Sequence, residues 1–179
     1  MGKEDGARRG SADHGWHLAQ DPLGVAMTDL EFAVLRAFEA FGRWQSQCLA
    51  AVSGATISGP ENVLLHVIAM KGQPKTIHDI ELLTNRADTT NIQYGLRKLL
   101  KLGFVEKEGS GRVGVYYRVT SEGARICRDY ADLRRKLLLG SIKALSKFES
   151  ESERAATLLE AVERIYGAAG REAATFHRR

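Results

Sequence analysis

The segment from Asp88 to Leu102 carries the side chains best suited to contacting an anionic polymer. It opens with short polar residues, and Gln93, Tyr94 and Arg97 follow on the same side of a predicted helix. Hydroxyl and amide groups can hydrogen-bond to base edges and phosphates, and the N-terminus of a helix favours anions. The polar face of this helix carries no carboxylate. These residue types predict a helix that contacts nucleic acid.

The opposite face of the same segment is apolar. Ile92, Leu96 and Leu99 recur at helical spacing, and Gly95 lies beside them. Because Gly95 has no side chain, a neighbouring helix can come close at that point. We therefore expect this face to pack against the protein and the polar face to remain open to a partner.

A β-hairpin is predicted directly after this helix. Its strands are expected over Phe104–Glu108 and Val113–Val119, joined by Gly109-Ser110-Gly111, with Arg112 at the tip. From Asp88 to Thr120 there are six Lys and Arg residues against three Asp and Glu residues. This local excess of cations accounts for most of the net charge of +4 of the whole chain.

A second, shorter helix precedes the polar one. Thr76 and Asp79 have the spacing of a capping box, and this helix is expected to end near Thr84-Asn85. Two helices separated by a tight turn and followed by a hairpin make a winged helix-turn-helix, which places its second helix in the major groove of DNA. The side chains expected to contact DNA are Thr76, Arg86, Thr89, Thr90, Asn91, Gln93, Tyr94, Arg97, Lys98 and Arg112.

Length and composition limit the other possibilities. The 179 residues are 44% apolar and 27% charged, which favours a folded chain with one core. Apolar runs are short and no signal peptide is visible, so we expect a cytoplasmic protein with no membrane partner. No phosphate loop, GxSxG or HExxH motif is present, so neither an enzyme nor a cofactor or metal is expected.

Long amphipathic helices are predicted on both sides of the central unit. The sequence indicates a flexible N-terminal arm over residues 1–27, dimerisation helices over 28–54 and 120–170, the winged helix-turn-helix over 57–119, and a basic tail over 171–179. Thr28 and Glu31 form a possible capping box at the start of the first helix. Ser58 and Glu61 form another, at the start of a helix expected to stop at Lys71-Gly72. The later helices are expected over Ser121–Phe148 and Glu149–Gly170. The predicted fold class is mainly α with a small β-wing.

The segment "LLTNRADTTNIQYGLRKLLKLGFVEKE", followed by "YYRVTSEG", resembles the MarR family of winged-helix transcription regulators. The resemblance extends over about Thr28 to Gly170 and implies a homodimer that binds an inverted-repeat operator on double-stranded DNA. The family's wing usually contains Asp-Arg-Arg, whereas this chain has Gly111-Arg112-Val113. The arginine is kept and its acidic neighbour is lost.

Members of this family often bind a small aromatic or acidic effector where the two parts of the protein meet. The resemblance implies Phe38, Phe41, Trp44 and His66 as candidates, although aromatic residues at helical spacing also suit a core. Cys48 and Cys127 suggest either a redox sensor or ordinary packing, and their positions on apolar stripes favour packing. The alternative to a regulator is a winged-helix module that binds proteins and not DNA.

Overall fold

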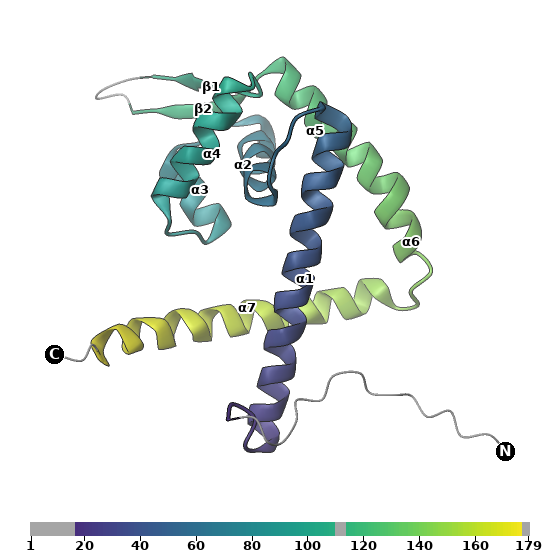
Figure 1. Ribbon diagram of the computed structural model, residues 1–179, viewed down its shortest axis with the longest axis vertical. Helices are drawn as coiled ribbons and strands as arrows, with labels where there is room; N and C mark the ends of the chain where they lie inside the picture. Colours follow the sequence, from purple (N-terminus) through teal and green to yellow (C-terminus); the bar gives the residue numbers. More distant parts are fainter. Residues whose placement is uncertain (1–16, 110–113, 177–179) are drawn as a thin grey trace. The chain divides into compact units, whose positions relative to one another are not determined.

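The computed structural model describes residues 17–109 and 114–176, and confirms a mainly helical fold with a two-stranded wing (Figure 1). Most of the expected N-terminal arm, the tip of the wing with Arg112 and the last three residues lie outside the described residues. The chain divides into two compact units, residues 1–131 and 132–179, and each is described by itself.

Helix α1 (Pro22–Ser53) begins six residues before the predicted start at Thr28. Asp21 caps it by accepting a hydrogen bond of 2.7 Å from the Gly24 amide, and Pro22 occupies the first turn. The prediction was wrong because an acidic cap followed by proline is a sufficient start signal by itself. Thr28 is instead buried inside the helix, where its hydroxyl donates to the Leu18 carbonyl oxygen.

Three helices follow: α2 (Gly59–Ala69), α3 (Ile77–Thr84) and α4 (Thr89–Lys101). The last two form the helix-turn-helix. The capping boxes predicted at Ser58 and Thr76 are both present, so both helices begin where the sequence indicates. Helix α2 ends at Ala69 and not at Lys71, since a 3₁₀ turn, η1 (Met70–Gly72), replaces its last turn.

The wing consists of β1 (Val105–Glu108) and β2 (Tyr116–Val119), paired antiparallel from Val105–Val119 to Glu108–Tyr116. Lys75, just before α3, exchanges two backbone hydrogen bonds of 2.8 and 2.9 Å with Tyr117. The hairpin is thereby attached to the helix-turn-helix. Both strands are shorter than predicted within the described residues.

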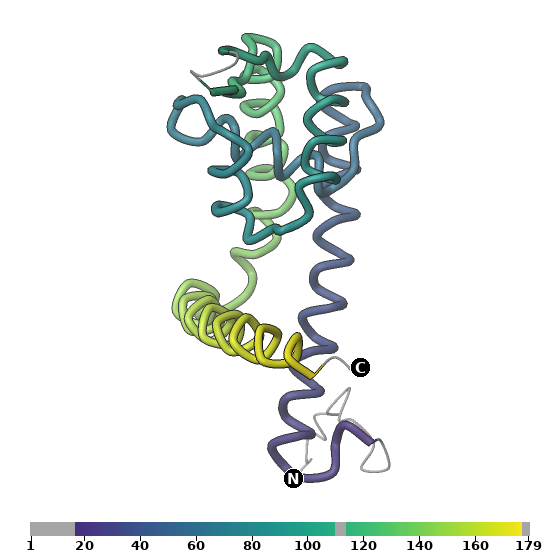
Figure 2. The backbone as a smooth tube through the Cα atoms, turned by 90° about the vertical axis from the view of Figure 1, so that its left-hand side faces the viewer, coloured from purple at the N-terminus to yellow at the C-terminus, as the bar shows by residue number. Residues whose placement is uncertain are grey.

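The core of the first unit lies where α1, α2, α4 and α5 (Ser121–Arg134) meet. Figure 2 shows the winged helix gathered around the C-terminal half of α1, while the N-terminal half extends away from it. The core side chains are fully buried, and they are Leu49, Ile57, Leu64, Leu65, Ile68, Ile80, Ile92, Leu96, Leu99 and Ile126.

The Val-Thr-Ser-Glu-Gly segment attaches α5 to the end of α4 and to the wing. The Thr120 hydroxyl donates to the Gly103 carbonyl oxygen at 2.7 Å and accepts from the Gly123 amide at 3.1 Å. A Cβ atom at Gly123 would lie 2.0 Å from the Phe104 carbonyl oxygen. Only glycine therefore allows α5 to begin this close to β1.

The second unit contains the rest of the long C-terminal segment. A π-helical stretch, η3 (Arg135–Leu139), leads into α6 (Gly140–Ile142), and α7 (Phe148–Ala173) ends in the 3₁₀ turn η4 (Ala174–Phe176). The helix predicted to continue to Phe148 therefore ends at Ile142. The expected tail from Arg171 is helical over its first residues. Within the described structure, no residue of α7 is buried.

Candidate nucleic-acid interface

Helix α4 has the two faces that its sequence predicts. Ile92, Gly95, Leu96 and Leu99 are buried, and a Cβ atom at Gly95 would lie 2.6 Å from a methyl carbon of Leu64 on α2. The absent side chain at Gly95 thus brings α4 directly onto α2. The other face is exposed and presents Thr90, Asn91, Gln93, Tyr94, Arg97 and Lys101.

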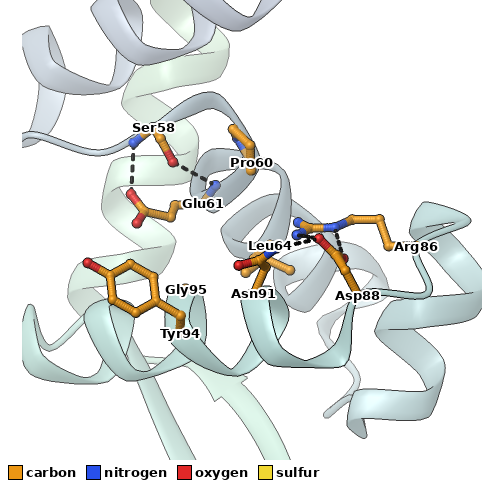
Figure 3. Close-up of a pocket in the computed structure, with 9 residues that line it drawn as sticks. All are labelled: Ser58, Pro60, Glu61, Leu64, Arg86, Asp88, Asn91, Tyr94 and Gly95. Carbon is orange, nitrogen blue, oxygen red and sulfur yellow. Dashed lines mark hydrogen bonds and ion pairs between the residues drawn. The ribbon is translucent and has the colours of Figure 1, made fainter.

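Asp88 binds two other side chains at the N-terminus of α4. Its two carboxylate oxygens accept hydrogen bonds of 2.9 and 3.0 Å from the guanidinium of Arg86, and a third of 3.0 Å from the side-chain amide of Asn91 (Figure 3). Because Arg86 and then Asn91 stabilise the charged form, the pKa of Asp88 is lowered to about 2. The expected DNA contact Arg86 is therefore already bound by a carboxylate.

Lys98 is also engaged within the protein. Its ammonium lies 2.8 Å from Glu61, whose carboxylate closes the capping box of α2 by accepting from the Ser58 amide at 2.8 Å. Burial favours the neutral acid, but the hydrogen bonds from Lys98 and Ser58 outweigh it and hold the pKa of Glu61 below its usual value. This ion pair joins the last turn of α4 to the first turn of α2.

Two of the hydroxyl groups expected to reach DNA serve local structure instead. The Thr76 hydroxyl caps α3 by accepting from the Asp79 amide, and it donates to the Asp79 carboxylate at 2.8 Å. The Thr89 hydroxyl donates to the carboxylate of Glu81 on α3. Thr76 therefore fixes the start of α3, and Thr89 joins α4 to α3.

A hollow of about 290 Å³ lies between the N-terminus of α2 and the outward side of α4. Pro60, Leu64 and Gly95 supply its apolar surface, and Asn91 and Tyr94 stand along α4 beside it (Figure 3). The Tyr94 side chain is 61% exposed. The hollow therefore belongs to the same surface as the exposed face of α4.

The candidate effector residues fall into two groups. Phe38 and Phe41 lie on α1 and are exposed, whereas Trp44 and His66 are half-buried. The Nε1 atom of Trp44 and the Nε2 atom of His66 are buried and find no hydrogen-bond partner among the described residues. The His66 ring lies 4.5 Å from that of Tyr130 on α5, and burial lowers the pKa of His66.

The two cysteines show the features of packing residues. Cys48 is buried in α1, and burial raises the pKa of its thiol. Burial also raises the pKa of the Cys127 thiol, to about 11. A high pKa leaves little thiolate at neutral pH, which disfavours reaction with oxidants. Over the described ranges, no three His, Cys, Asp or Glu side chains gather in a way that suits a metal ion.

Comparison with known proteins agrees with this geometry. Residues 57–123 match the family described as winged helix DNA-binding domain. Among curated protein sequences, none matches this chain closely enough to count as a relative.

Several solved structures of other proteins match this chain over most of their own length. Reduced AbfR bound to DNA, a protein of Staphylococcus epidermidis, has a TM-score of 0.63 at 15% identity, covering 80% of this chain and 94% of AbfR. Staphylococcus aureus MarR in complex with salicylate and kanamycin has a TM-score of 0.61 at 15% identity, covering 78% and 92%. The Mycobacterium tuberculosis transcriptional regulator MosR with DNA has a TM-score of 0.59 at 16% identity, covering 75% and 96%.

At these sequence identities the solved structures establish the fold of this chain. The predicted resemblance to MarR-type winged-helix regulators is therefore confirmed for the fold. No helix in the described part of the chain is both long enough and apolar enough to cross a membrane.

Proposed function

We propose that this chain is a cytoplasmic transcription regulator of MarR type that binds double-stranded DNA sequence-specifically as a homodimer. The observation that carries the proposal is the outward face of α4. Helix α4 contains no Asp or Glu over its whole length, and its exposed side chains are hydroxyls, amides, a phenol and cations. Such groups suit base edges and phosphates, and they would meet no repulsion from a carboxylate of the same helix.

Side-chain interactions inside the winged helix hold α4 in a fixed position relative to its neighbouring helices. The ion pair of Lys98 with Glu61 and the hydrogen bond of Thr89 to Glu81 tie α4 to α2 and α3. Base reading then falls to Asn91, Gln93 and Arg97, which are exposed. Lys98 and Thr89 would act mainly by positioning α4, and Thr76 by capping α3. Arg112 would add a cation on the wing near the minor groove or backbone.

Solved structures with this fold include complexes with DNA. AbfR and MosR were both solved bound to DNA, and both match this chain over more than nine-tenths of their own length. We infer that residues 57–119 form the DNA-binding domain of this chain. The family matched by residues 57–123 supports the same division.

The homodimer is inferred from apolar side chains that the described chain leaves exposed. Leu23, Phe38 and Phe41 are each more than half exposed along α1, and Leu158 and Ile165 are so on α7. Helices in proteins owe most of their stability to packing of an apolar face, and no residue described in α7 is buried. We therefore assign residues 28–54 and 120–170 to dimerisation, where a second copy would cover these faces.

An effector site is proposed around Trp44 and His66. Each has a buried polar nitrogen without a partner in the described structure, and such groups favour a ligand that can hydrogen-bond to them. A small aromatic or acidic molecule would supply both an apolar ring and acceptor oxygens. The S. aureus MarR structure that shares this fold contains salicylate, an aromatic acid.

The test is an electrophoretic gel shift with a randomised duplex library, followed by enrichment and sequencing of the retarded DNA. We expect one enriched motif arranged as an inverted repeat. A library that is retarded but yields no motif would show a charge-driven binder without base reading. If no duplex is retarded at low salt, the alternative of a protein-binding winged helix is favoured and the regulator assignment is wrong.

A further inference from the structure

The Arg86–Asp88–Asn91 cluster at the N-terminus of α4 has a geometry that the fold itself does not require. Asp88 precedes the first residue of α4, yet its side chain makes no capping hydrogen bond to the helix backbone. Instead, its carboxylate accepts from the side chains of Arg86 and Asn91. Aspartate in this position normally stabilises a helix by capping it. Here it organises two side chains of the proposed DNA surface.

The hydrogen bond to Asp88 fixes the orientation of the Asn91 amide. A carboxylate accepts hydrogen bonds and cannot donate them, so only the NH₂ group of Asn91 can face it. The amide oxygen, Oδ1, must then point away from Asp88, and Asn91 is exposed on the outward face of α4 (Figure 3). A freely rotating asparagine presents donor and acceptor equally, whereas this one presents its acceptor.

The same carboxylate holds Arg86 in a paired state. The Arg86 side chain is 22% exposed, and both the Nε and an Nη atom are bound to Asp88 in the two-point geometry that guanidinium groups use for phosphates. While the pair is intact, Arg86 contributes little free charge to a DNA backbone. Asp88 therefore reduces sequence-independent attraction at the place where Asn91 meets the bases.

We propose that Asp88 is a specificity-determining residue, which orients Asn91 to accept from an amino-bearing base and keeps Arg86 from binding phosphates. In the major groove the amino groups belong to adenine and cytosine, and adenine can also accept from the second NH of Asn91 through N7. The preferred base opposite Asn91 is therefore adenine, with cytosine second. Because this role presupposes the DNA-binding function proposed above, its test must separate the two.

The experiment compares motif enrichment from the randomised duplex library for wild type and four variants. Asn91→Ala should lose the preference at one position of each half-site. Asp88→Ala should lose the preference at that same position, by roughly 5- to 100-fold, because the amide is then free to rotate. Unlike a variant that only loses a contact, Asp88→Ala should bind non-specific duplex more tightly than wild type, with a salt slope steeper by about one per protomer.

Two further variants isolate the parts of the cluster. Arg86→Gln should keep the base preference and should not raise non-specific binding, since Asp88 still holds Asn91. The double variant Arg86→Gln/Asp88→Ala should lose the preference without the gain in non-specific binding. Thermal unfolding of each variant checks that α4 is intact, and Asp88→Gly also lacks an acceptor and retains a residue suited to the start of a helix should Asp88→Ala unfold.

NMR of the Asn91 side-chain amide gives a readout that needs no DNA. Its resonances should lie away from random-coil positions in wild type and return to them in Asp88→Ala. Random-coil positions already in wild type, or an unchanged motif in Asp88→Ala, would overturn the role of Asp88 while leaving DNA binding in place. Failure of wild type to enrich any motif would overturn both, and the NMR result would then describe only a local structural contact.

Discussion

Arg97 and Lys101 are the exposed cations of α4 for which the described residues supply no acidic partner, and Arg97 is the one with a guanidinium group. It lies on the outward face near Gln93 and Tyr94, whereas Arg86 and Lys98 are each paired with a carboxylate. An unpaired guanidinium on this face can bind guanine at two points. Within the cluster of predicted contacts, Arg97 is thus the residue on which direct base reading depends most.

Replacing Arg97 by alanine should cost roughly 1–3 kcal/mol in operator binding and relax the preference at particular positions. The measurement is a titration of operator and scrambled duplexes at several salt concentrations. Arg112→Ala is the comparison variant, and it should weaken all sequences alike and lower the salt slope by about one unit. Equal losses on operator and scrambled DNA for Arg97→Ala would make Arg97 a phosphate contact.

The Glu61–Lys98 pair should make the free energy of unfolding depend on pH. Its carboxylate has a lower pKa in the folded protein than its ordinary value of 4.5, so the folded state binds fewer protons than the unfolded chain. The stabilisation is complete above that value and is lost as the pH falls toward the lowered pKa. Lys98→Met should cost about 1–3 kcal/mol near neutral pH, because Glu61 is then buried without its charged partner.

Urea unfolding at several pH values from about 7 down to about 3 measures the effect. The loss of stability in acid should be smaller in Lys98→Met than in wild type. Lys101→Met removes an exposed cation one turn away and should stay within about 0.5 kcal/mol of wild type. Parallel pH profiles for wild type and Lys98→Met would show that the pair does not stabilise the fold.

At the same scale, the sequence predicted which face of α4 would be exposed but not which of its polar groups would be used internally. Helical periodicity alone separates Ile92 and Leu96 from Gln93 and Arg97. Lys98 pairs with Glu61, which is 37 positions away in the sequence, and only the packing of α4 on α2 brings them together. Arg86, Asp88 and Asn91 lie within six positions, so the Asp88 cluster is local in sequence, but spacing alone does not show which side chain Asp88 binds.

At the scale of helices and strands, the start of a helix is predicted correctly where the local sequence contains a complete capping motif. Both capping boxes gave the correct starts of α2 and α3. The start of α1 was missed because Asp21-Pro22 was assigned to the arm. The break before α7 was not predicted, because the residue that precedes α7, Lys147, adopts a left-handed conformation, with φ of 62°, that glycine usually occupies.

Gly123 shows most directly how one position sets the geometry between elements. Its replacement by alanine would put a Cβ atom within 2.0 Å of a backbone oxygen of Phe104, so α5 and β1 would have to separate. We expect Gly123→Ala to destabilise the fold by about 1–3 kcal/mol, measured by thermal or urea unfolding. Gly42→Ala is the matched control, since a Cβ atom there meets nothing within 4 Å. Equal stabilities of the two variants would contradict the close approach.

For the whole molecule, the exposed apolar faces predict a stable dimer at micromolar concentration. Phe38→Asp and Ile165→Asp should each shift the protein toward monomer in sedimentation equilibrium, because each places a charge on a face that a second copy covers. Leu82→Asp changes an equally exposed leucine on α3 and should leave the dimer intact. A wild-type protein that sediments as a monomer would remove the basis for a two-fold operator.

The central claim is that a symmetric dimer reads DNA with its two α4 helices. Hydroxyl-radical footprinting of the wild-type protein on the enriched duplex tests this claim most directly. A dimer that places one α4 in each of two successive major grooves should protect two half-sites related by an inverted repeat and centred about one helical turn, ~34 Å, apart. Protection of a single asymmetric half-site, or uniform protection without sequence preference, would contradict it.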